Sequence, residues 1–131
     1  MLTKRQPHTE PTHRPKYVEE KVDAADVVEF LNLTRDSDPH IRKRALGNLC
    51  PCHVKTNHPQ VWDRIIEMAG DDDPKVRSAV LHSLCDGSPN ERHEEVVAAL
   101  QNLHNDPDLK LRRRVRKVLA QYRHSGTINV L

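Results

Sequence analysis

The residues best suited to chemistry are cysteines and histidines that gather in two stretches of the chain. They are Cys50, Cys52, His53 and His58 in the first stretch, and His82, Cys85 and His93 in the second. Thiolates and imidazoles are ligands that zinc prefers, and a structural zinc site requires four of them around one centre. A thiolate beside a base is also a nucleophile, and two thiols can form a redox pair.

The spacing of these residues favours packing over metal binding or catalysis. Cys50 and Cys52 form a C-x-C pair, which is a poorer zinc signature than C-x-x-C, and no second closely spaced pair follows. We therefore interpret the cysteines as small packing residues and predict no metal, no cofactor and no catalytic residue. A structural zinc ion or a redox pair is the weaker alternative, with the candidates Cys50, Cys52, His58 and Cys85.

The second group is a basic segment at the end of the chain. Residues 109–131 hold seven basic and no acidic side chains, whereas residues 70–108 hold nine acidic and three basic ones. The seven cations are Lys110, Arg112, Arg113, Arg114, Arg116, Lys117 and Arg123. The cluster is a solvated cap, a surface for an acidic protein, or a contact for nucleic acid. Nucleic acid is the least favoured, because only Tyr122 is available beside the cluster for base stacking.

Composition excludes several classes. The 131 residues are 36% hydrophobic with a formal net charge of +2, which allows one modest core and no bulk attraction to nucleic acid or membranes. No apolar run approaches the roughly 18–20 residues of a membrane span, and the N-terminus lacks the apolar core of a secretory signal. Three cysteines are an odd and sparse set, which predicts a reducing, cytoplasmic setting.

An internal repeat in the sequence predicts the helices that position these residues. Three segments align at an offset of 35 residues, namely 36–42, 71–77 and 106–112, each with aspartates ahead of an arginine. Apolar residues follow at i, i+4 and i+8, for example Val76, Val80 and Leu84, which is one stripe of an amphipathic helix. A second apolar pattern, such as Trp62, Ile65 and Met68, precedes each aspartate cluster and predicts another helix.

Each unit is therefore predicted to be a helical hairpin. The first helices are expected over about 24–34, 59–69 and 92–104, and the second helices over about 39–50, 74–85 and 109–122. The aspartates suit N-caps, and proline suits the first turn of the second helix. Such a hairpin cannot bury its apolar faces alone, so three units are expected to stack around a shared core.

A hairpin whose second helix opens with D-x-D-P-x-[VI]-R resembles the HEAT repeat, in particular the short HEAT-like units also found in bilin lyases. The resemblance covers roughly residues 24–122 and implies an all-α fold, an α-solenoid of three HEAT-like helical hairpins. It implies that the turn aspartates and the following arginines bond between or within units as a structural ladder. The ladder residues are Asp36, Asp71 and Asp106 with Arg42, Arg77 and Arg112.

The resemblance also implies that exposed residues of the second helices form the binding strip. Arg116 aligns with Leu46 and Leu81, and we interpret it as a polar residue on the outer face of the last unit. The predicted binding residues are Lys43, Ser78, His82, Arg113, Arg116 and Lys117.

We expect a flexible, basic, proline-containing arm over residues 1–22, a three-unit repeat domain over 23–124 and a tail over 125–131. The apolar end of the tail either folds back onto the stack or stays loose. The predicted function is a non-catalytic protein-interaction or scaffold module, whose partner is a protein with an acidic surface or a second copy. Alternatives are nucleic-acid binding through the arm and the last helix, and an accessory role in a lyase-like, cofactor-handling complex.

Overall fold

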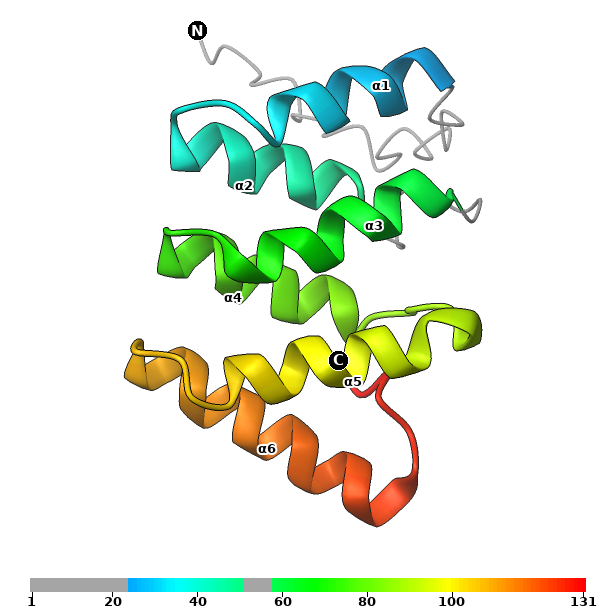
Figure 1. Ribbon diagram of the computed structural model, residues 1–131, viewed down its shortest axis with the longest axis vertical. Helices are drawn as coiled ribbons and strands as arrows, with labels where there is room; N and C mark the ends of the chain where they lie inside the picture. Colours follow the sequence, from blue (N-terminus) through cyan, green and yellow to red (C-terminus); the bar gives the residue numbers. More distant parts are fainter. Residues whose placement is uncertain (1–23, 51–57) are drawn as a thin grey trace, which may run out of the picture.

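The computed structural model describes residues 24–50 and 58–131, so the predicted arm over 1–22 lies outside the described residues. The described residues form three antiparallel helical hairpins that stack one beside the next (Figure 1). The first helices are α1 (Ala24–Leu33), α3 (Pro59–Glu67) and α5 (His93–Leu103), and the second helices are α2 (Pro39–Asn48), α4 (Pro74–Leu84) and α6 (Leu109–Ser125). Short 3₁₀ helices, η1 (Met68–Gly70) and η2 (Asn90–Arg92), adjoin α3 and α5.

The all-α solenoid predicted from the repeat is thus confirmed, and no strand occurs in residues 24–50 or 58–131. The six helices begin and end within three residues of the predicted bounds. The largest difference is at the end of α6, which continues to Ser125 and stops where Gly126 adopts a left-handed conformation with φ of 72°. Left-handed backbone terminates a helix and is accessible to glycine at little cost.

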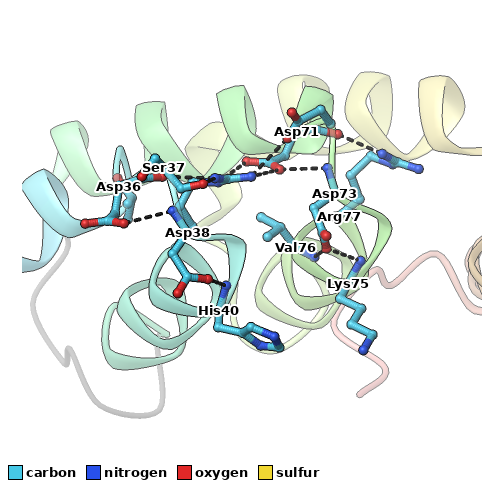
Figure 2. Close-up of polar contacts among 12 residues, drawn as sticks. Asp36, Ser37, Asp38, His40, Asp71, Asp73, Lys75, Val76 and Arg77 are labelled. Carbon is cyan, nitrogen blue, oxygen red and sulfur yellow. Dashed lines mark hydrogen bonds and ion pairs between the residues drawn. The ribbon is translucent and has the colours of Figure 1, made fainter.

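The second helix of each unit begins at an aspartate. The carboxylates of Asp38 and Asp73 accept hydrogen bonds of 2.8 Å from backbone N–H groups of the first helical turn (Figure 2), and that of Asp108 accepts one of 2.9 Å in α6. Proline occupies the first position of α2 and α4, where its missing N–H is not needed, and leucine occupies that position in α6. The repeated aspartates therefore determine where each hairpin turns.

The hydrophobic core runs through all three hairpins without interruption. Its members include Val27 of α1, Trp62 and Ile65 of α3, and Leu100 of α5, each almost fully buried. The second helices contribute the predicted stripe, and Leu46 and Leu81 are both 0% exposed because the following unit covers them. Each hairpin thus buries its apolar faces against its neighbour, as stacked repeats require.

The C-terminal segment folds back onto the stack. After α6 the chain returns towards α5 (Figure 1), and Ile128 is buried in the common core. The Asn129 side chain accepts hydrogen bonds from the N–H groups of Gly87 and Ser88, at 2.8 and 2.9 Å. The Leu131 N–H donates to the Cys85 carbonyl at the end of α4. Of the two alternatives for the apolar end of the tail, the structure shows the folded-back one.

Candidate binding surface

The orientation of the second helices is set by arginines that bridge consecutive units. The Arg42 guanidinium donates two hydrogen bonds of 3.0 Å to the Asp71 carboxylate of the next unit. Arg77 donates two bonds to Asp106 in the same way, at 2.8 and 3.0 Å. A planar guanidinium facing a carboxylate through two parallel bonds restricts rotation as well as distance.

Each ladder arginine also bonds backbone carbonyl groups. A third nitrogen of Arg77 donates to the Asp71 carbonyl at 2.8 Å (Figure 2), and Arg42 does the same to the Asp36 carbonyl at 2.9 Å. The bridging carboxylates are held in turn, because Asp71 accepts from the Asp73 N–H and Asp106 from the Asp108 N–H, both at 2.9 Å. One arginine therefore ties the turn of its own unit to the turn of the next.

The electrostatics of the ladder follow from these contacts. Desolvation on its own would raise the pKa of Asp71, but the hydrogen bonds from Arg42 and the Asp73 N–H, with the Arg42 charge, lower it below its ordinary value. The pKa of Asp106 is lowered through Arg77 and the Asp108 N–H, which outweigh its desolvation. The pKa of Arg77 is raised by its bonds to Asp106. Both bridges are consequently ionised at neutral pH.

The two ends of the ladder differ from its middle. The Asp36 carboxylate accepts from the Asp38 N–H of its own turn at 2.8 Å, and no unit precedes it in the described residues. Arg112 donates to the Asp106 carbonyl of its own unit at 3.2 Å. Of the six predicted ladder residues, four bridge units and these two bond within their own turns.

A hollow of about 360 Å³ lies on the side of the molecule formed by the second helices. We call it the cationic hollow, because the described residues that line it include Lys43, Lys75 and Arg114 and none of them is acidic. The three cations come from α2, α4 and α6, so all three units contribute. The lining also contains the half-buried Ala79 and the fully buried Leu46.

The predicted binding residues fall into two groups. Lys43, Ser78 and His82 line the cationic hollow, together with Arg114, whose guanidinium donates to the Ser78 hydroxyl at 2.7 Å. The other three, Arg113, Arg116 and Lys117, are exposed on α6 outside its lining. Lys75 was missed by the sequence analysis, although the aligned positions hold the basic residues His40 and Lys110.

Comparison with protein families decides what kind of repeat this is. A family model described as HEAT repeats matches residues 27–120, which is most of the chain. The chain belongs to the HEAT repeat family. No curated protein and no solved structure matches it. HEAT repeats generally mediate protein interactions or scaffolding, and the family is typically non-catalytic.

Arginines outside the ladder also join the HEAT units, and these were not anticipated. Arg64 of α3 donates to the hydroxyl and the carbonyl of the buried Thr34, both at 3.0 Å, and so bonds a free carbonyl at the end of α1. Arg92 donates to Asp63 at 2.5 Å and to the Pro59 carbonyl at the start of α3. Neither arginine recurs at the 35-residue offset, so the repeat pattern carried no signal for them.

The two described cysteines occupy equivalent places in the first and second HEAT units. Cys85 is fully buried, and burial raises the pKa of its thiol to about 11, with a smaller opposing contribution from the Arg114 charge. A thiol with this pKa is protonated at neutral pH and is a poor nucleophile or metal ligand. Cys50 is also buried, but its sulfur lies 3.6 Å from the Asp86 carboxylate.

The remaining candidates are dispersed. His58 is the residue before α3, and Cys52 and His53 lie outside the described residues. His93 lies on α5, where its Nε2 is 2.8 Å from the Tyr122 hydroxyl. His82 is brought instead to Asp86, with 3.4 Å between the Nε2 atom and the carboxylate. None of the described helices has the length and apolar character required to cross a membrane.

Proposed function

We propose that this HEAT repeat protein is a non-catalytic interaction module that binds an acidic segment of another protein in the cationic hollow. The observation that carries the proposal is the convergence of Lys43, Lys75 and Arg114, from three units, on one hollow in which no described lining residue is acidic. The three cysteines are an odd and sparse set, which supports a reducing compartment such as the cytoplasm.

The chemistry of the hollow suits an acidic peptide. Lysine ammonium groups and an arginine guanidinium attract carboxylates, while the half-buried Ala79 offers apolar contact to the rest of a side chain. The Ser78 hydroxyl orients Arg114 from the neighbouring unit, which restricts the guanidinium before a ligand arrives. A partly preorganised cation loses less conformational freedom on binding.

Nucleic acid is the second candidate, and the exposed cations of α6 favour it. Arg113, Arg116 and Lys117 all face solvent, and together with the arm they would supply several phosphate contacts. These residues lie outside the hollow, so the two candidate functions require different sets of basic residues. The cofactor-handling alternative stays a prediction.

A pair of charge-matched variants separates these functions. The first, Lys43/Lys75/Arg114→Ala, removes three cations from the hollow, and the second, Arg113/Arg116/Lys117→Ala, removes three from the surface of α6. Binding of a fluorescein-labelled peptide with glutamate at alternate positions is measured by anisotropy. We expect the first variant to bind about tenfold more weakly than the wild type, since each rim ion pair contributes a fraction of a kcal/mol.

The second variant is the control, because it has the same net charge as the first and is expected to retain peptide binding. Equal losses in both variants would show that only overall charge matters and would overturn the proposal. A labelled single-stranded oligonucleotide tests the other candidate. Tight oligonucleotide binding that falls steeply with salt and is abolished by the second variant would support nucleic-acid binding instead.

A further inference from the structure

Three potential metal ligands meet beside the cationic hollow. The Cys50 sulfur, the His82 Nε2 atom and a carboxylate oxygen of Asp86 all lie within 4.8 Å of one another. Cys50 follows α2 in the first unit, whereas His82 and Asp86 lie one helical turn apart at the end of α4 in the second. The stacking of two units, and not any local motif, brings these side chains together.

Two of the three separations among these ligand atoms match the edges of a zinc coordination tetrahedron. The sulfur lies 3.6 Å and the imidazole nitrogen 3.4 Å from the same carboxylate oxygen, Oδ2. With zinc bonds of the usual length to sulfur, nitrogen and oxygen, tetrahedral angles place those pairs about 3.5 and 3.3 Å apart. These two separations therefore differ by only about a tenth of an ångström from those of a bound ion, and the sulfur–nitrogen separation, which is within 4.8 Å, must come to about 3.5 Å when the ion binds.

We propose that Cys50, His82 and Asp86 bind a zinc ion. Among the residues that the structure describes no fourth ligand is present, which leaves the fourth position open to a water molecule or a partner's side chain. Binding forms the zinc–sulfur bond as the Cys50 thiol gives its proton to solvent. The thiolate and the Asp86 carboxylate then balance the two positive charges of the metal, and His82 coordinates as neutral imidazole. This inference does not depend on the proposed function.

The ligand set and its exposure both fit zinc. A thiolate with an imidazole and one carboxylate suits zinc, while magnesium and calcium require mostly oxygen ligands. Cys50 is buried, but the side chains of His82 and Asp86 are 53% and 29% exposed, so solvent reaches the site. Cys50 and His82 also line the cationic hollow, and the open position therefore faces the surface proposed for partners.

The experiment measures metal binding directly, because the same separations are also compatible with hydrogen bonds among the three groups. The full chain is stripped with a chelator, desalted and titrated with cobalt(II) chloride, a spectroscopic substitute for zinc, without peptide present. We expect one cobalt ion per chain and a thiolate-to-cobalt charge-transfer band that zinc chloride abolishes by displacement.

Variants assign the band to its ligands. Cys50→Ala is expected to abolish the charge-transfer band, and His82→Ala and Asp86→Asn to weaken cobalt binding. Cys85→Ala is the matched control, since it removes a buried thiol from the equivalent place in the next unit and is expected to leave the band intact. Circular dichroism of each variant checks that the fold persists.

Two results would overturn the proposal. One is the absence of stoichiometric cobalt and zinc binding by the wild-type chain. The other is a charge-transfer band that survives Cys50→Ala and disappears in Cys52→Ser or Cys85→Ala, which would assign the thiolate elsewhere. The titration contains no peptide, so a negative result would not count against the proposed binding of an acidic peptide in the hollow, which is tested separately.

Discussion

At the scale of single residues, the arginine at the repeated position of the second helix does not have the same role in all three units. Arg42 and Arg77 each join the carboxylate of the following turn to a carbonyl of their own turn, whereas the Arg112 guanidinium donates to the Asp106 carbonyl of its own unit. The bridge between Arg77 and Asp106 is also well shielded, with side chains 12% and 4% exposed. Identity at a repeat position therefore does not imply an equal contribution to stability.

This difference predicts unequal costs for one substitution. Arg77→Lys replaces a guanidinium that makes two bonds to Asp106 with a single ammonium, and is expected to lower the free energy of unfolding by about 1.5–3 kcal/mol. Arg112→Lys loses a bond within its own unit, and we expect a cost under about 1 kcal/mol. Urea denaturation of both variants measures the difference, and equal costs would contradict a bridging role for Arg77.

At the scale of the elements, the helices depend on local backbone chemistry at both ends. The N-caps are aspartates that recur in all three units, but the C-terminal ends differ from unit to unit. Only α6 ends, among the described helices, in a left-handed glycine. Gly47, by contrast, lies within α2. Apart from the chain neighbours and the helix's own backbone, no described residue has an atom within 4 Å of the position that a Cβ would occupy at either glycine.

Alanine substitutions at these two glycines are therefore predicted to change the stability of the protein in opposite directions. Gly126→Ala forces an alanine into the left-handed region and is expected to cost about 1 kcal/mol. Gly47→Ala removes backbone freedom from a helical position and is expected to stabilise by about 0.5–1 kcal/mol. Thermal unfolding of the two variants shows whether each substitution raises or lowers the melting temperature. If both shifted it in the same direction, backbone conformation would not be the cause.

At the scale of the whole molecule, each second helix packs against the unit that follows it, and α6 presents a polar surface at the position where another unit would pack. Leu46 and Leu81 are covered by the units that follow them, while the aligned Arg116 is exposed. Terminal repeats require such a polar outer face for solubility. The charge of Arg116 thus opposes the docking of a further apolar surface on α6.

We predict that Arg116→Leu promotes self-association, because it restores the apolar residue of the other two units to an exposed face. Sedimentation velocity over a range of concentrations is expected to show dimers or larger species for this variant and fewer for the wild type. Arg113→Leu is the control, since it adds the same side chain to α6 outside this alignment. Equal association of both variants would attribute the effect to general hydrophobicity.

The amino-acid sequence by itself determined the helices, their pairing into three units and the members of the core. Helix periodicity and N-caps are local properties, so Asp73, Val76 and Val80 indicate a helix start and its buried face without knowledge of the rest of the chain. The exact repeat length then required the units to stack in register. The ladder was implied by the resemblance to HEAT repeats, which left open whether its aspartates and arginines bond between or within units.

Only the tertiary structure decided which side chains meet across units. The cationic hollow, the bonds of Arg64 and the meeting of Cys50 with His82 and Asp86 depend on the rotation and separation of neighbouring hairpins. Those quantities are set by the volumes of all buried side chains together and by the bridging arginines. No local pattern encodes them, so Asp86 and Lys75 gained their importance only once the units were placed side by side.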